Sequence, residues 1–163
     1  MPPGIRRDHP FHTAGGTVPS IEERLIRLED IERIRRLKAE YCNVCDDHHD
    51  PDAIVRLFAA DGIWEADGLG AYRGHDEIRR AFERFGRSIR FSQHNTTNLD
   101  ITVTGNTARG TWHFVGVVDF HDGPARLTLA RYDERYVKID RDWKFAHLSA
   151  VRLAHHELPD LQR

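Results

Sequence analysis

Apolar side chains recur at steps of three and four residues along the early part of the chain. Between residues 20 and 47 they form one stripe, which predicts an amphipathic helix that could break near Asp30. Ser20 and Glu23 stand at the spacing of a capping box, an arrangement that begins helices. Asp50-Pro51-Asp52 then ends this helix and starts a short second one, because proline is tolerated in a first helical turn.

After Gly86 the pattern changes from a helical period to strand-like segments rich in Val, Thr, Phe, Tyr and Trp. Helices followed by an antiparallel meander predict an α+β domain. We expect a strongly curved, mostly antiparallel sheet wrapped around the N-terminal helices as a cone-shaped α+β barrel, which would enclose a largely apolar pocket. The expected segments are a third helix at residues 75–85 and strands at residues 63–66, 96–103, 108–119, 125–139 and 143–153.

The length of 163 residues fits one domain. Residues 1–19 contain several Pro and Gly and show no periodicity, so we expect an irregular N-terminal arm. The domain should span residues 20–154, and residues 155–163 should form a C-terminal tail. The N-terminus has no apolar signal segment and no apolar run could cross a bilayer, so the sequence predicts a cytoplasmic protein without a membrane partner.

Charge, cysteines and paired histidines do not indicate a nucleic acid, a cofactor or a metal. The formal net charge is −2 and the pI is about 6.6, whereas nucleic-acid binding needs a basic face. Cys42 and Cys45 have the C-x-x-C spacing, but they fall near a helix end and not at the helix N-terminus that activates redox thiols. Zinc would need further ligands, so we interpret both as packed apolar residues. The histidine pairs at residues 48–49 and 155–156 have diverging side chains, which is typical of surface positions.

Tyr41 and Asp46 stand five residues apart near the end of the first helix, and His94 lies in an apolar and Thr-rich strand. A carboxylate bound to one nitrogen of a histidine fixes its tautomer, so the other nitrogen can remove a proton. A tyrosine hydroxyl can stabilise the enolate that results. The three residues could therefore form a proton-transfer site without metal or cofactor. The alternatives are a histidine bonded to a backbone carbonyl, a core tyrosine and a solvated aspartate.

His113 lies at even spacing from Val115, Val117 and Asp119, so the four share one strand face. If that face lines the pocket, His113 is a second acid or binding group and both valines belong to the wall. The alternatives are an exposed or hydrogen-bonded histidine and a strand-end aspartate. Large aromatic residues in the wall would suit a flat hydrophobic substrate. The wall is expected to include Trp64, Phe82 and Trp112.

Several motifs resemble those of one known family. They are Tyr41-x4-Asp46, Asp50-Pro51-Asp52-Ala53 with Leu57-Phe58-Ala59-Ala60-Asp61-Gly62-x-Trp64, Gly70-x-Tyr72-x-Gly74 and Trp143-Lys144-Phe145. Over roughly residues 21–150 the chain resembles the SnoaL-like branch of the nuclear-transport-factor-two-like superfamily. That superfamily includes dehydratases, isomerases, cyclases and non-catalytic members, so the fold alone settles no function.

Within this superfamily, the site resembles that of scytalone dehydratase, bile-acid dehydratases and hexachlorocyclohexane dehydrochlorinase. The resemblance implies that Asp46 and His94 form a base unit and that Tyr41 polarises a substrate oxygen. It also implies that Asp119 stands where the dehydratases have a second acid or histidine. The loop after Asp46 is one residue longer than usual, which makes Asp47 an alternative partner of His94.

Two functions remain open from the sequence. The first is a cofactor-independent dehydratase or isomerase that removes a proton alpha to a carbonyl on a hydrophobic, polycyclic or aromatic small molecule. The second is a non-catalytic small-molecule-binding domain or accessory subunit, which is favoured by Ala130 and Tyr132 where the fungal dehydratase has Ser and Asn. Because family members commonly pair through the outer face of the sheet, we also expect a homodimer or homotrimer.

Overall fold

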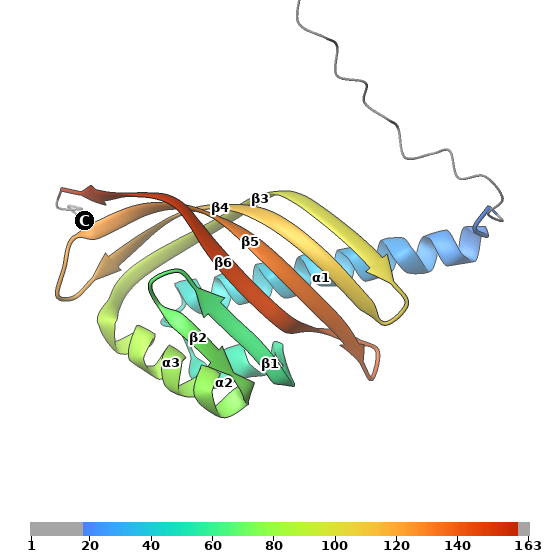
Figure 1. The fold of residues 1–163 in the computed structure, drawn as a ribbon, viewed down its shortest axis with the longest axis horizontal. Coiled ribbons are helices and arrows are strands. Elements are labelled where there is room, and N and C mark those ends of the chain that lie inside the picture. Colours follow the sequence, from blue (N-terminus) through green and yellow to red (C-terminus); the bar gives the residue numbers. More distant parts are fainter. Residues whose placement is uncertain (1–17, 160–163) are drawn as a thin grey trace, which may run out of the picture.

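A computed structural model describes residues 18–159 as three helices and a six-stranded sheet (Figure 1). The helices are α1 (Ile21–Asp46), α2 (Pro51–Val55) and α3 (Gly74–Ser88). The strands are β1 (Phe58–Ala66), β2 (Gly70–Arg73), β3 (Ile89–Thr104), β4 (Thr107–Phe120), β5 (Ala125–Ile139) and β6 (Asp142–Leu158). No helix between residues 18 and 159 combines the length and apolar character needed to cross a membrane.

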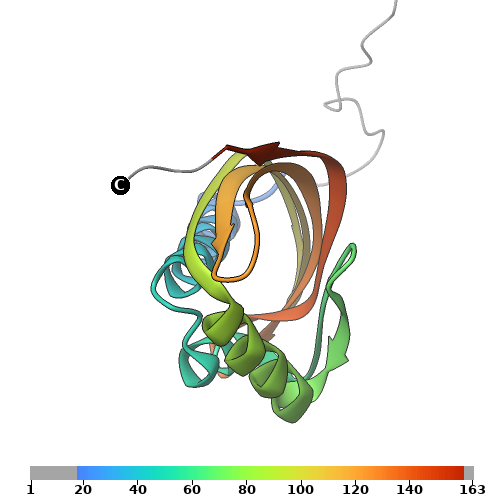
Figure 2. The same ribbon diagram turned by 90° about the vertical axis from the view of Figure 1, so that its left-hand side faces the viewer.

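The strand order is β2-β1-β6-β5-β4-β3, in which β1 and β6 are parallel and the other neighbours are antiparallel. The sheet curves strongly, and α1 runs along its concave side (Figures 1 and 2). This confirms the expected α+β fold with a curved sheet around N-terminal helices. The barrel is not closed, because β2 and β3 are the two edges of the sheet and do not pair with each other.

Helix α1 begins where the capping box predicts. Ser20 Oγ accepts the backbone N–H of Glu23 (3.1 Å), and the Glu23 carboxylate accepts the backbone N–H of Ser20 (2.7 Å). The expected break near Asp30 is wrong. The Asp30 carboxylate is buried and accepts hydrogen bonds from Lys138 Nζ (2.7 Å) and Trp143 Nε1 (3.0 Å), so the sheet satisfies this polar residue within a continuous helix.

The strands are longer than their sequence patterns predict. β1 already starts at Phe58, and the glycine-rich stretch that follows contains the short strand β2. β3 starts at Ile89, so His94 lies well inside a paired strand. β6 continues to Leu158, so residues 155–158 pair with β5 instead of beginning a tail. Residues 1–17 of the expected arm, and the last residues of the expected tail, lie outside the described residues.

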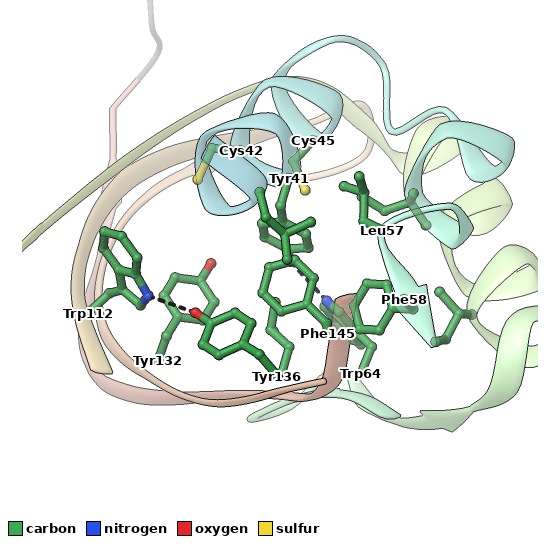
Figure 3. Close-up of a cluster of buried hydrophobic side chains, with 14 of the residues drawn as sticks. Tyr41, Cys42, Cys45, Leu57, Phe58, Trp64, Trp112, Tyr132, Tyr136 and Phe145 are labelled. Carbon is green, nitrogen blue, oxygen red and sulfur yellow. Dashed lines mark hydrogen bonds between the residues drawn. The ribbon is translucent and has the colours of Figure 1, made fainter. Parts of the chain in front are cut away.

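The core lies between α1 and the concave face of the sheet, where aromatic side chains point toward one another (Figure 3). Tyr41 of α1 meets Tyr132 of β5 and Phe145 of β6 edge-on, with ring centroids 6.3 and 5.7 Å apart, a favourable arrangement for aromatic pairs. Cys42 and Cys45 are buried free thiols in the same core. Burial raises the pKa of both thiols, so they remain protonated packing residues.

A buried ion pair connects α1 and β5 next to these aromatic rings. Lys38 Nζ lies 2.6 Å from Glu134 Oε1, and both side chains are completely buried. Tyr136 Oη donates to the other oxygen of Glu134, and Trp112 Nε1 donates to Tyr136 Oη (3.1 Å). The ammonium also lies 3.2 Å from the centre of the Tyr132 ring. Hydrogen bonds therefore satisfy the buried charges, as burial of a charge requires.

Candidate active site

Asp46, the last residue of α1, and His94, in the middle of β3, form a closely coupled pair. His94 Nδ1 lies 2.6 Å from Asp46 Oδ1, and the backbone N–H of His94 donates to Asp46 Oδ2 (2.9 Å). Ser92 Oγ, two residues earlier on the same face of β3, donates to Asp46 Oδ1 (3.3 Å) and to the Cys45 carbonyl (2.9 Å). These bonds fix the carboxylate against the ring.

The geometry sets the tautomer of His94. An ionised carboxylate only accepts hydrogen bonds, so Nδ1 carries the proton and Nε2 keeps its lone pair. Burial alone would raise the pKa of Asp46, but the hydrogen bonds from the ring and backbone of His94 bring that pKa below its ordinary value. The pair is therefore an ionised aspartate that orients a histidine whose second nitrogen can take a proton.

Asp46, and not Asp47, is the partner of His94. Asp47 is the C-cap residue of α1, and its side chain is exposed. In the loop after Asp46, His48 and His49 have positive φ angles of 59° and 58°. The chain thus leaves the helix through two consecutive left-handed residues, and Asp46 remains the residue that contacts His94.

Tyr41 lies on α1 five residues before Asp46 and is 2% exposed. Its Oη accepts a hydrogen bond from Trp64 Nε1 (2.8 Å), and its ring lies edge-on to His94 with centroids 6.5 Å apart. Burial raises the pKa of Tyr41 well above its ordinary value. The hydroxyl is therefore protonated. It also interacts with the side chains of Cys45 and Tyr132, so donation of its proton to a ligand oxygen would replace these contacts.

A cavity of about 390 Å³ is lined by Tyr41 and His94. Its wall is largely aromatic, and the structure places Trp64 and Phe82 in it together with Phe85, Phe114 and Phe120. Ala130 and Tyr132 of β5 also line it. The Phe114 ring packs on the His94 ring, with centroids 5.1 Å apart, and Gly116, the β4 residue paired with His94, leaves the space that Phe114 occupies.

The remaining candidates on β4 do not line this cavity. The prediction that His113, Val115, Val117 and Asp119 share one strand face is consistent with the alternation, but that face points outward, because Phe114 and Val118 point inward. The prediction that Val115 and Val117 line the wall is therefore wrong, and Val115 is 40% exposed. The predicted role of His113 as an acid in the pocket is wrong for the same reason.

Trp112 and Asp119 also lie away from the cavity. Trp112 points inward but packs deeper in the core, where its Nε1 binds Tyr136, so its predicted place in the cavity wall is wrong. Asp119 is buried near the end of β4, with Oδ2 3.4 Å from Arg90 Nη1. It borders a separate cleft near the β4–β5 turn and does not take the place of a second acid beside His94.

His49 is a site residue that the sequence analysis placed on the surface. Its imidazole is 5% exposed, lines the cavity between Phe82 and Phe85, and has no hydrogen-bond partner within residues 18–159. Burial, together with the nearby His94, lowers the pKa of His49 to about 4. Gly86 of α3 lies so close to the His48 carbonyl that a Cβ there would be only 2.8 Å away, so this glycine lets the loop approach. His49 is therefore a neutral imidazole within the cavity.

Within residues 18–159, no group of three or more His, Cys, Asp or Glu side chains is arranged to hold a metal. The groups around the cavity that can donate or accept protons include His94 with its Asp46 carboxylate, the phenols of Tyr41 and Tyr132, and the imidazoles of His49 and His155. Such a set can move protons between carbon and oxygen atoms of a bound molecule.

Comparisons with known proteins agree with this architecture. The profile of the SnoaL-like domain matches residues 26–149. A candidate scytalone dehydratase from Novosphingobium aromaticivorans is 20% identical, with 82% of this chain and 91% of that chain covered at a TM-score of 0.74. A hexachlorocyclohexane dehydrochlorinase from Novosphingobium barchaimii is 21% identical, with 86% and 97% covered at 0.76. These two likenesses establish the fold alone.

A third similar structure is a candidate aromatic ring hydroxylase from Novosphingobium aromaticivorans. It is 25% identical, with 80% of this chain and 94% of that chain covered at a TM-score of 0.76. Among proteins with curated descriptions, none matches the sequence.

Proposed function

Because the chain belongs to the SnoaL-like domain family, we propose that it is a cofactor-independent lyase or isomerase acting on a hydrophobic, aromatic or polycyclic carbonyl compound. The observation that carries this proposal is the His94–Asp46 pair beside an apolar cavity, with His94 Nε2 left without a protein partner within residues 18–159. A base of this kind is worth most where the surroundings exclude water, and the aromatic wall provides such surroundings.

Each residue has a distinct role in the proposed reaction. His94 Nε2 removes a proton from the carbon next to the carbonyl group, and the Asp46 carboxylate stabilises the imidazolium that forms. Tyr41 donates its hydroxyl proton in a hydrogen bond to the carbonyl oxygen, which becomes the enolate oxygen. The proton stays on His94, and the electron pair moves onto the substrate oxygen.

The fate of that enolate decides the product. If the next carbon carries a hydroxyl group, the enolate expels it as the carbonyl re-forms, and the His94 proton leaves with the oxygen as water. If it carries none, His94 returns the proton at another carbon, and the product is an isomer. His49, as a neutral imidazole in the same cavity, can hydrogen-bond to a departing or a retained hydroxyl.

The test is exchange of the acidic protons of acetylnaphthalene and related aryl ketones in deuterium oxide, followed by NMR. Replacing His94 by Ala should slow the exchange at least about a hundredfold, the ordinary contribution of a general base, while the domain stays folded. His113→Ala is the matched control, because that histidine points outward from β4. An exchange rate in His94→Ala equal to that of the parent protein would reject the proposed base.

A binding or accessory role without chemistry is the second candidate. It is favoured by Ala130 and Tyr132 in the cavity wall, because these two residues replace the serine and asparagine that scytalone dehydratase has at the corresponding positions. Calorimetric binding of the aryl ketones without exchange or product would support this role instead of the first.

We also propose that the outer face of the sheet pairs with further copies of the chain. Val115 and Leu129 are register partners on this face and are 40% and 42% exposed, and the neighbouring pair Val117 and Leu127 extends the apolar patch. Exposed apolar patches of this kind mark interaction surfaces. Light scattering should give a dimer or trimer, and Leu129→Glu should shift it toward the monomer.

A further inference from the structure

Arginine side chains from three different elements line the outer part of the cavity. They are Arg84 of α3, Arg126 of β5 and Arg152 of β6. Arg84 and Arg152 are exposed and Arg126 is half-buried, whereas Tyr41 and Tyr132 at the other end of the cavity are buried. The start of β5 and the end of β6 lie at the same end of the sheet (Figure 1). The cavity is therefore apolar inside and cationic at its mouth.

These guanidinium groups have few partners within residues 18–159. Arg152 makes no side-chain ion pair there, and its guanidinium lies over Gly68, where an added Cβ would be 3.5 Å from both Nη atoms. Arg84 Nη1 donates only to the Arg80 carbonyl (3.1 Å), and its guanidinium carbon lies 5.3 Å from the centre of the Tyr72 ring. In the described part of the chain, no carboxylate lies within ion-pair distance of either guanidinium group.

Arg126 is incompletely satisfied as well. Its Nη2 lies 3.7 Å from Glu157 Oε1, but its Nε is buried and has no hydrogen-bond partner among the described residues. A buried donor of this kind normally has an acceptor. The carboxylate that does line the cavity, Asp67, accepts the backbone N–H of Arg152 (3.0 Å) instead of pairing with a guanidinium. The mouth therefore keeps excess positive charge and free donors.

We propose that the substrate is an amphipathic acid with a carboxylate at one end. Its aromatic or polycyclic body, with the carbonyl group, fills the inner cavity beside Tyr41 and His94, and its carboxylate binds Arg84 and Arg152 at the mouth. Planar guanidinium groups match a carboxylate with paired hydrogen bonds, which gives both affinity and orientation. The orientation rests on the proposed function, because it presents the carbonyl end to His94.

The test compares two probes of the same shape: naphthoylpropionate, an aryl ketone with a carboxylate, and its neutral amide. The parent protein should bind the acid at least about tenfold more tightly than the amide, as expected for a charge-assisted pair. Arg84→Gln and Arg152→Gln should each reduce this preference severalfold and leave the affinity for the amide unchanged, which also shows that the variants are folded. Arg109→Gln is the matched control, since Arg109 is an exposed residue on the outer face of β4.

The outcomes separate this inference from the proposed function. Equal affinities for acid and amide in the parent protein, or an equal loss of preference in Arg109→Gln, would overturn the carboxylate site. Deuterium exchange of the same ketone tests His94 independently, because binding of the acid does not need the base. Acid preference without exchange would therefore reject the chemistry and keep the carboxylate site, and exchange without acid preference would do the reverse.

Discussion

Helix α1 carries two short polar pairs, an ammonium–carboxylate pair and a carboxylate–imidazole pair, with different surroundings. Lys38 Nζ lies 2.6 Å from Glu134, and Asp46 Oδ1 lies 2.6 Å from His94 Nδ1. The first pair is completely buried, whereas the Asp46 and His94 side chains are 28% and 11% exposed beside the cavity. A closed pair with every charge satisfied serves stability and specificity, while a pair that leaves one nitrogen open to a ligand can do chemistry.

The largest expected effect comes from breaking the open pair at its carboxylate. Asp46→Asn should lower the rate of deuterium exchange by about a hundredfold to ten-thousandfold, because an amide can donate to Nδ1 and favours the wrong tautomer of His94. The free energy of unfolding should fall by much less than the activation free energy of the exchange reaction rises. NMR exchange rates and urea unfolding of the same variant measure both.

The control for this variant is Asp47→Asn, which removes the same charge one residue later. Asp47 is exposed and caps α1, so its exchange rate should stay close to that of the parent protein. If the two variants lost equal activity, the loss would reflect the general charge near the cavity, and the assignment of Asp46 as the orienting carboxylate would be rejected.

Breaking the closed pair should act on stability instead. Lys38→Met leaves Glu134 as an unpaired buried charge, which typically costs about 3–5 kcal/mol of unfolding free energy. The double variant Lys38→Met with Glu134→Leu removes both charges and should recover most of that loss. Urea denaturation measures both variants. A double variant no more stable than the single one would show that the pair itself, and not the orphaned charge, stabilises the fold.

Tyr41 lies between the two pairs, because the centre of its ring is 4.7 Å from Lys38 Nζ and its side chain also lines the cavity beside His94. Tyr41→Phe should reduce the exchange rate at least about tenfold by removing the donor to the enolate oxygen. It should also cost about 1–2 kcal/mol of stability, because Trp64 Nε1 loses its acceptor. The control Tyr72→Phe removes a hydroxyl that binds the Leu69 carbonyl, and its exchange rate should stay at the parent level.

The helical region was more predictable from sequence than the sheet. The capping box of Ser20 and the stripe along α1 are local signals, and they place Tyr41 and Asp46 five residues apart near the helix end. On β4, alternation correctly groups His113 with Val115, but it cannot tell which face is inside when both faces carry large apolar residues. The packing of Phe114 against His94 decides that question in three dimensions.

The position of His49 could not be read from the sequence for a different reason. Its inward direction depends on two consecutive left-handed residues and on the close approach of Gly86, and adjacent histidines give no signal for either. The extension of β6 was missed because residues 155–157 are polar, and their strand conformation comes from pairing with β5. Long-range contacts thus determine the features that local pattern does not.

The smallest expected effect separates His49 from its neighbour through pH. Burial lowers the pKa of His49 to about 4, whereas an unfolded histidine titrates near 6.5. Between these values the unfolded chain binds more protons, so the stability from this group is present above pH 6.5 and is lost as pH falls toward 4. From pH 7 to pH 5 the loss should be about 2 kcal/mol.

Urea unfolding at pH 7 and pH 5 tests this for the parent protein, His49→Asn and His48→Asn, since asparagine tolerates the left-handed backbone at both positions. His49→Asn should lose about 2 kcal/mol less than the parent protein over this range, and His48→Asn should lose as much as the parent. Because the pKa of Asp46 is lowered in the folded state, its contribution to stability is lost only when the pH falls through the ordinary titration range of a carboxyl group. That range lies below pH 5, so Asp46 does not affect the comparison between pH 7 and pH 5. An equal loss of stability in all three proteins would mean that His49 is solvated in the folded state. That result would reject the assignment of His49 as a neutral imidazole within the cavity.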